Sequence, residues 1–171
     1  LPMFLISALR FNVGSDFLAV YWNGFQRVQA GINTDNFEIG FQGLIKLLGK
    51  ISSSPQILII FTSFLFVFFT WNAIYDQSND IIFSLLILFI SRYYFISLNV
   101  IRQLIAMAII LYALKYLKEG KDIKYILFNL IAFTIHRSAL ICLVFLLIKK
   151  IDLTKLKYLL MFLGLLILVY G

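Results

Sequence analysis

Long apolar runs separated by short polar turns make up most of the chain. Residues 56–75 contain no charged side chain, and residues 81–98 form a second apolar run with Arg92 inside it. A third run covers residues 99–116 and has no charge through its centre. Each run is close to the roughly 20 residues that a helix needs to cross a hydrocarbon core of about 30 Å. The pattern therefore predicts three membrane-spanning helices.

Residues 33–54 show a different pattern, in which apolar positions recur at helical spacing. Polar side chains, Glu38, Gln42, Lys46 and Lys50, fall on the opposite face. An amphipathic helix of this kind is typical of the membrane interface, where it lies without spanning. The apolar face comprises Phe37, Phe41, Leu44, Ile45, Leu47, Leu48 and Ile51.

The segment before this helix begins with a loop. Asn12, Gly14 and Ser15 are residues that favour turns, and Asp16 is placed to cap the helix that follows it. We expect residues 10–54 to form a loop and an amphipathic helix on the outer face of the membrane.

Residues 125–148 allow two arrangements, a single kinked helix or a hairpin of two short halves broken at His136–Ser138. Lysine clusters occupy both flanking bends, at residues 118–124 and 149–157. Lysine and arginine in short loops mark the cytoplasmic side, and both bends lie inside only if the chain returns to the side that it left. This placement favours the hairpin.

Composition supports the same class of protein. Hydrophobic residues make up 62% of the 171 residues, charged residues 13%, and the mean hydropathy is +0.96, outside the range of ordinary soluble domains. The single cysteine, Cys142, excludes an internal disulfide framework and offers no zinc spacing. We expect one all-α integral membrane domain over residues 1–171, with transmembrane helices over 56–171. We also expect a piece of a longer protein, since it starts without Met and ends inside the apolar run 158–170.

The two kinds of cation separate if the lysine bends are cytoplasmic. Eight of the ten lysines then lie inside, while all five arginines lie toward the outer side, against the positive-inside bias. Guanidinium groups suit fork-like recognition of phosphate and carboxylate, so the outer face is predicted to bind an anion such as a phosphorylated lipid. The inner lysines are Lys115, Lys118, Lys121, Lys124, Lys149, Lys150, Lys155 and Lys157, and the arginines are Arg10, Arg27, Arg92, Arg102 and Arg137.

Arg102 is the first candidate functional residue because it starts an otherwise apolar helix. An arginine there is costly unless it is paired or has a function, and the alternative is an anchor that extends to the interface. Asp16 is a candidate general base or simply a helix cap, and His136 a candidate proton carrier or a packing histidine. Glu38 is interpreted as part of a solvated face, and Arg137, like Arg92, as an interface anchor.

Several classes of site are missing from the sequence. It contains no glycine-rich phosphate loop, no zinc motif and no nucleophile elbow. The basic clusters are not part of a soluble domain, so nothing indicates a nucleic-acid partner.

Four short elements in order resemble the EpsG family of Wzy-like polysaccharide polymerases. The resemblance covers nearly all of the chain through Leu140, and it departs from the family pattern at Ser15, Phe17 and Ile135 without losing a charge. The elements are Arg10 with Gly14-Ser15-Asp16 and Tyr21, then Phe37-Glu38-Ile39-Gly40-Phe41, then Asn99-Val100-Ile101-Arg102-Gln103-Leu104-Ile105-Ala106, then Ile135-His136-Arg137-Ser138-Ala139-Leu140.

The resemblance implies a multi-pass enzyme of the bacterial inner membrane with a GT-C-like helical fold. Such an enzyme joins oligosaccharide repeat units carried on undecaprenyl pyrophosphate into exopolysaccharide, capsule or O-antigen. It needs no nucleotide sugar, cofactor or metal. Its partners would be membrane lipids, a flippase and a chain-length regulator.

The implied reaction is glycosyl transfer with inversion. Arg102 and Arg10 would hold the pyrophosphate and stabilise its charge as it leaves. Asp16, or else His136, would accept the proton of the attacking hydroxyl. The remaining predicted site residues, placed at the phosphate, the sugar or the approach to them, are Asn99, Gln103, Glu38, Tyr21 and Gly14.

Three other classes remain open. A lipid-linked oligosaccharide flippase or another transporter would use the same arginines along a path, but it should carry polar residues through its spans. The run after Gln56 is polar only at Thr62, Ser63, Thr70 and Asn72. A scaffolding subunit would need no ordered set of outer charges, and an acyltransferase should have an acidic motif beside His136.

Overall fold

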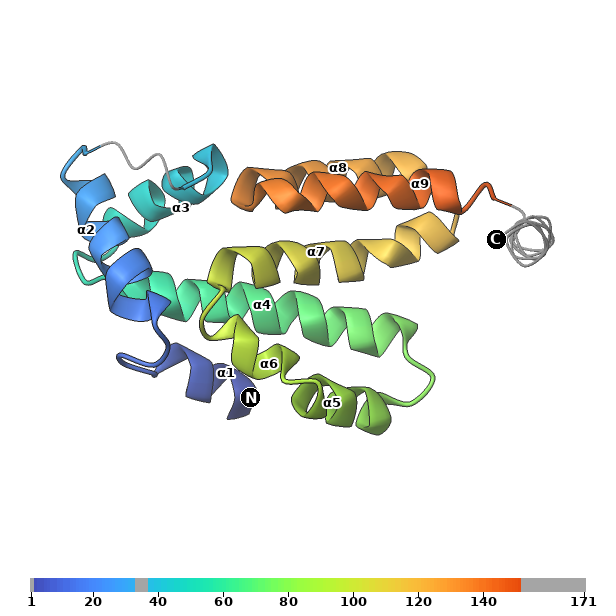
Figure 1. Ribbon diagram of the computed structural model, residues 1–171, viewed down its shortest axis with the longest axis horizontal. Coiled ribbons are helices and arrows are strands. Elements are labelled where there is room, and N and C mark those ends of the chain that lie inside the picture. Colours follow the sequence, from blue (N-terminus) through green and yellow to red (C-terminus); the bar gives the residue numbers. More distant parts are fainter. Residues whose placement is uncertain (1, 33–36, 152–171) are drawn as a thin grey trace, which may run out of the picture.

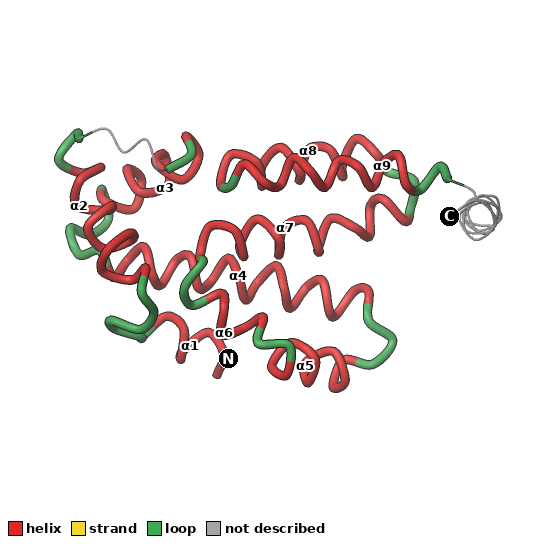
Figure 2. The backbone as a smooth tube through the Cα atoms, viewed as in Figure 1, coloured by secondary structure: helices red, strands yellow, loops and turns green. Residues whose placement is uncertain are grey.

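The computed structural model describes residues 2–32 and 37–151, and every regular element in these two stretches is helical (Figures 1 and 2). The all-α prediction is therefore confirmed for this part of the chain. The elements are α1 (Pro2–Ala8), the π-helix η1 (Phe17–Trp22), α2 (Asn23–Gln29), α3 (Ile39–Gly49), α4 (Gln56–Gln77), α5 (Ile81–Ile90), α6 (Tyr93–Ser97), α7 (Ile101–Lys118), α8 (Asp122–Ile135), the 3-10 helix η2 (Arg137–Leu143) and α9 (Val144–Ile148).

Helix α7 lies at the centre, between α4 on one side and the α8–α9 pair on the other (Figure 1). Its buried side chains point in nearly every direction around the helix, as expected for a helix covered on both sides. Helices α4 and α7 run parallel, because α5 and α6 return the chain between them. At their shared end the Gln77 amide donates to the carbonyl of Leu111 at 2.8 Å.

Among the described residues, α4 alone has both the length and the apolar composition to cross a membrane. Helix α7 has 18 residues, a rise of about 27 Å, but it carries Arg102, Lys115 and Lys118. The first and third predicted spans therefore correspond to real helices. That the protein crosses the membrane several times stays a prediction.

The second predicted span, residues 81–98, is wrong as a single helix. Helix α5 ends at Ile90, and Arg92 adopts a left-handed backbone with φ of 61° before α6 begins. A ten-residue helix rises about 15 Å, half of a hydrocarbon core. Beyond the break, the Tyr94 hydroxyl donates to the carbonyl of Met3 at 2.7 Å and its side chain is buried. This contact with α1 helps to set the new direction of the chain.

The hairpin predicted for residues 125–148 is confirmed, and the single kinked helix is excluded. Helix α8 ends at Ile135, His136 is extended, and η2 and α9 return along α8 (Figure 1). The Tyr125 hydroxyl donates to the Cys142 carbonyl at 2.6 Å, and the Asn129 amide donates to the Ala139 carbonyl at 3.0 Å. Lys149 pairs with Asp122 at the open end of the hairpin.

The amphipathic helix exists as α3, shorter than predicted. It buries Phe41, Ile45 and Leu48 and exposes Lys46, but Leu47 and Ile51, expected on the apolar face, are exposed. A Cβ at Gly40 would lie 2.4 Å from Thr134 Oγ1, so glycine here allows α3 to approach α8 closely. The start of the predicted helix, 33–36, and the apolar run 158–170 lie outside the described residues, as do Lys155 and Lys157.

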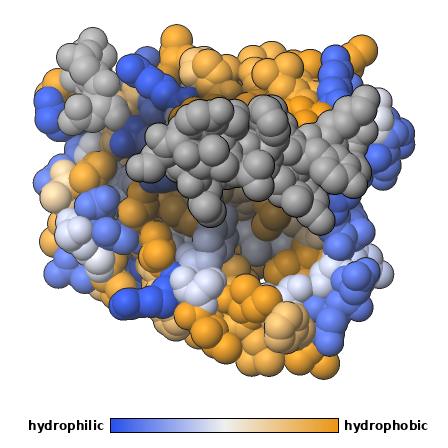
Figure 3. Space-filling view, turned by 45° about the vertical axis from the view of Figure 1, so that its right-hand side comes forward, coloured by the Kyte–Doolittle hydropathy of each residue, from blue (hydrophilic) through white to orange (hydrophobic). Residues whose placement is uncertain are grey.

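The surface has polar ends and apolar flanks. Hydrophilic residues gather at the left and right edges of the face in Figure 3, where the helices end, and hydrophobic residues lie above and below. Large apolar side chains are exposed along α5, η2 and α8, including Ile82, Ile141 and Ile123. Extensive exposed apolar surface is typical of a protein that contacts lipid or a partner.

Candidate functional site

An ion pair joins the start of α7 to the residue before α3. Arg102 Nη1 lies 2.5 Å from Glu38 Oε2, across 64 positions of sequence. The two side chains are only 17% and 11% exposed. The interpretation of Glu38 as part of a solvated face is therefore wrong, because its carboxylate turns inward to meet Arg102.

The break between α8 and η2 approaches the same carboxylate. His136 Nδ1 lies 3.2 Å from Glu38 Oε1, and the backbone N–H of Arg137 donates to that oxygen, also at 3.2 Å. Helix α8 ends at Ile135 and His136 is extended, so the Arg137 N–H lies outside the helix and can donate to Glu38. Glu38 thus connects α3, α7 and the hairpin break.

Glu38 is ionised at neutral pH. Burial would raise its pKa, but hydrogen bonds from its own N–H and that of Arg137, together with the charge of Arg102, outweigh burial. The net result is a pKa below the ordinary glutamate value.

Aromatic rings surround the cation of this pair. The guanidinium carbon of Arg102 lies 5.0 Å from the centroid of Phe37 and 5.9 Å from that of Phe41, within the range of cation–π contacts. Tyr21 stacks on Phe37 with centroids 6.5 Å apart. Burial raises the pKa of the Tyr21 phenol, and the nearby charge of Arg102 only partly opposes this. The sequence predicted only that Phe37 and Phe41 belong to the apolar face of the helix. It does not show that their rings face Arg102.

The loop before η1 is docked on Asn99. Asn99 Oδ1 accepts from the backbone N–H of Asp16 at 3.0 Å and from Ser15 Oγ at 3.3 Å. Gly14 has φ of +93°, and a Cβ there would lie 2.8 Å from the same oxygen. Only glycine fits both the backbone conformation and this close approach.

The prediction that Asp16 caps the following helix is wrong. The residue stands at the start of η1, but its side chain makes no capping hydrogen bond. Its carboxylate instead accepts from Ser15 Oγ at 3.2 Å and is partly exposed. Tyr21 lies close enough to both Asp16 and Arg102 for their charges to act on its phenol.

Arg10 has partners of its own. It is buried, and it donates to the Ser7 carbonyl and, at 3.1 Å, to Ser63 Oγ on α4. Its backbone carbonyl accepts from the Gln56 amide at 3.1 Å. Burial lowers the pKa of Arg10 to about 10, so it remains a cation at neutral pH. The structure thus places Arg10 in a polar seam between α1 and α4, where it fastens the loop that leads to Asp16.

The four sequence elements therefore meet around the first turn of α7. Asn99 holds the Gly14–Asp16 loop, and Arg102 holds Glu38, which in turn meets His136. Gln103, the remaining predicted residue, follows Arg102 and is half-buried. Within the described stretches, no three His, Cys, Asp or Glu side chains are arranged to hold a metal ion.

A cavity of about 550 Å³ adjoins Glu38 on the side of α3 and α8. Such a volume lies within the range of small-molecule sites, roughly 300–1,000 Å³. Its lining is formed by Phe37, Glu38, Ile39, Gln42, Phe133, Thr134 and Arg137.

In the residues that the structure describes, these features define a helical protein with apolar flanks and an inward-facing charged cluster at one end of its helices. The EpsG family model matches residues 1–171, and the chain belongs to this family, as its four elements predicted. The family suggests a Wzy-like role in polysaccharide biosynthesis, a lipid-linked saccharide as substrate, and association with a membrane. Comparisons with curated proteins and with solved structures found no match.

Proposed function

We propose that this protein is a polymerase that joins undecaprenyl-pyrophosphate-linked oligosaccharides on the outer face of the bacterial inner membrane. The observation that carries the proposal is the cluster of Arg102, Glu38 and His136, built from the family's own sequence elements beside a cavity of substrate size. In this proposal the protein is a multi-pass glycosyltransferase of exopolysaccharide, capsule or O-antigen synthesis. A flippase would supply its substrate, and a chain-length regulator would limit its product.

Arg102 is the proposed ligand of the pyrophosphate. The Arg102 guanidinium already holds a carboxylate, that of Glu38, in a partly shielded pair, and the same fork of donors suits a phosphate. A pyrophosphate would share or replace Glu38 as the partner of Arg102. The fixed guanidinium would then stabilise the charge that develops on the leaving group.

The proposed reaction is a single displacement at the anomeric carbon of the donor. An acceptor hydroxyl oxygen bonds to that carbon while the bond from carbon to the pyrophosphate oxygen breaks, and its electron pair leaves with the pyrophosphate. Asp16 takes the hydroxyl proton, because its carboxylate is partly exposed and its backbone is fixed by Asn99. His136, held beside Glu38, is the second candidate for this proton.

The other predicted site residues have supporting roles in this proposal. Gly14 and Asn99 hold the loop that carries Asp16, and Tyr21 stacks on Phe37, the ring that faces Arg102. Gln103 would bind sugar or phosphate from the first turn of α7. Arg10 acts as a positioning residue, since it fastens the same loop to α4.

The experiment is complementation of a polymerase-deletion strain with full-length wild type or Arg102→Ala, with membrane abundance followed by a tag. We expect long polymer with wild type and, with the variant, single lipid-linked units accumulating on the outer leaflet. Accumulation on the inner leaflet would instead indicate a flippase. Unchanged polymer would return Arg102 to the role of an interface anchor.

Asp16→Asn tests the assignment of the base separately. The amide keeps the shape of the side chain and the backbone bond to Asn99, but it cannot accept a proton. Polymerisation should fall by about a hundredfold or more at equal abundance. Full activity of this variant would assign the role of base to His136 instead. In that case His136→Gln should abolish polymer formation.

A further inference from the structure

The cavity beside Glu38 has a mixed lining of aromatic rings and polar groups. Phe133 supplies exposed aromatic surface, whereas Phe37 is buried, and Gln42 and Thr134 add an amide and a hydroxyl. The Gln42 amide is oriented by a hydrogen bond from Nε2 to the Phe37 carbonyl at 2.7 Å. A pyranose ring has the matching surface, with apolar faces and hydroxyl groups around its edge.

The two charged residues of the cavity lining are Glu38 and Arg137. The Glu38 carboxylate is already engaged by Arg102 and by the Arg137 N–H. The Arg137 side chain also lines the cavity and is exposed, and no carboxylate of the described residues lies within ion-pair distance of its guanidinium. A guanidinium at the wall of a polar cavity favours a ligand with a carboxylate or phosphate, which it can hold through two parallel hydrogen bonds.

We propose that this cavity binds the acceptor saccharide and that Arg137 selects an acceptor sugar carrying a carboxylate, as in a uronic acid. The inference rests on the proposed polymerase function and names the substrate class of its second site. Arg102 pairs with Glu38 Oε2 and is not part of the cavity lining, whereas Arg137 is, so the proposal assigns pyrophosphate and acceptor saccharide to different cations. Arg137 is thereby a specificity residue and not an interface anchor.

The cavity's size fits this ligand. A volume of about 550 Å³ accommodates more than one sugar ring, as expected for the end of a growing chain. A phospholipid headgroup could offer the same anionic chemistry. The amide, the hydroxyl and the exposed Phe133 ring of the lining favour a saccharide over a headgroup, which needs only the cation.

The test measures binding of two disaccharides to full-length protein in nanodiscs of zwitterionic lipid. The probes are cellobiose and its counterpart ending in glucuronic acid, which differ only in one carboxylate. Wild type should bind the charged probe about tenfold more tightly, and Arg137→Gln should remove this preference while retaining cellobiose binding. Arg137→Lys, which keeps the charge but loses the fork, should lie between them.

Arg92→Gln is the matched control, because it removes an exposed arginine outside this cavity. It should keep the full preference for the charged probe. Phe133→Ala should weaken both probes equally, because the ring contacts the sugar and not its charge. Thermal unfolding of each variant establishes that the fold is retained, and the Arg137 substitutions leave the backbone bond to Glu38 intact.

Equal binding of both probes by wild type would overturn the inference. So would an equal loss of preference in Arg92→Gln, or displacement of the charged disaccharide by anionic phospholipid added to the nanodiscs. Failure of the proposed function gives a different result. Deletion of the gene then leaves polymer unchanged, even if the purified protein still prefers the charged probe through Arg137. An active polymerase without the preference would disprove the acceptor inference alone.

Discussion

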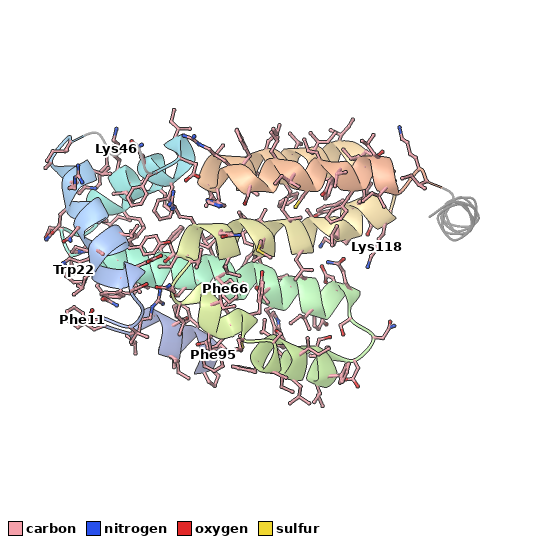
Figure 4. All side chains as sticks on the ribbon, viewed as in Figure 1. Phe11, Trp22, Lys46, Phe66, Phe95 and Lys118 are labelled. Atoms are coloured by element: carbon pink, nitrogen blue, oxygen red, sulfur yellow. The ribbon has the colours of Figure 1, made fainter. Side chains whose placement is uncertain are left out.

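The two ends of α7 both carry ion pairs, but their surroundings differ. At the arginine end, defined by Arg102 with Glu38 and His136, the paired side chains are 17% and 11% exposed. At the lysine end, the Lys115–Asp76 pair is 19% and 32% exposed, and the Lys121–Glu119 pair in the turn after α7 is 52% and 48% exposed. The lysines at this end are Lys115, Lys118, Lys121, Lys124, Lys149 and Lys150. In Figure 4 the lysine end is marked by Lys118, and Trp22 and Lys46 mark the opposite end of the bundle.

The pairs also differ in how far apart their members lie in sequence. Lys121 and Glu119 are two positions apart and Lys115 and Asp76 are 39 apart, whereas Arg102 and Glu38 are 64 apart and also meet His136. Exposed pairs contribute little to stability and need no function beyond placing charge at an interface. A distant, shielded pair that also meets a histidine is more costly to assemble, which favours a functional role. The candidate site therefore differs from the lysine end in the burial and the partners of its charged side chains, and not in the number of charges.

Exchanging the cations at each end should have the largest effect. Arg102→Lys keeps the charge but loses the two-pronged geometry and the stacking over Phe37, so polymer formation should fall by about a hundredfold. Lys115→Arg, at the other end of the same helix, should remain within about twofold of wild type. Polymer yield per unit of membrane protein measures both, and equal losses would remove the functional distinction between the ends.

Removing the acid at each end should affect stability next. Glu38→Gln leaves the shielded Arg102 without its counter-charge and should lower the free energy of unfolding by about 3 kcal/mol. Asp76→Asn breaks the more exposed pair with Lys115 and should cost less than about 1 kcal/mol. Unfolding in detergent with increasing denaturant gives both values. A larger cost for Asp76→Asn would contradict the comparison.

Two glycines, one near each end of α7, allow the backbone at the two ends to be compared. Gly14 and Gly120 both have positive φ, +93° and +75°, but only Gly14 faces a neighbour, Asn99 Oδ1. Gly120→Ala should cost about 1 kcal/mol from backbone strain alone, and Gly14→Ala about 2 kcal/mol. Gly14→Ala should also reduce polymer formation, because the strained loop carries Asp16. Equal losses of stability in the two variants would mean that the loop at Gly14 can move away from Asn99 without a cost in free energy.

The smallest effect is a pH dependence at the arginine end. Because the folded state lowers the pKa of Glu38, its ionised form stabilises the fold above the ordinary value of 4.5. This contribution is lost as the pH falls below 4.5 and Glu38 becomes protonated. The difference in unfolding free energy between wild type and Glu38→Gln should therefore shrink on acidification. Glu119→Gln, at the lysine end, should show no such trend once salt screens its exposed pair.

The sequence by itself determined the helices that depend on local pattern. The apolar runs at 56–75 and 99–116 became α4 and α7 with ends displaced by only a few residues, since hydrophobic periodicity acts over a few turns. The lysine bends predicted the hairpin, because both bends lie on the same side only if the chain between them returns to the side that it left. Four short elements also determined the family.

Tertiary structure decided which of these residues meet. From sequence, Glu38 was predicted to be solvated, but the packing of α3 near the start of α7 pairs it with Arg102. Asp16 was predicted to cap a helix, but in the structure it is its backbone N–H that bonds, to Asn99. From sequence, Arg92 was predicted to lie within one span. In the structure its left-handed backbone and the hydrogen bond of Tyr94 to α1 divide that segment into two helices. Local sequence sets helical propensity over a few residues, whereas burial and ionic partners depend on contacts between positions tens of residues apart, which only the packed chain defines.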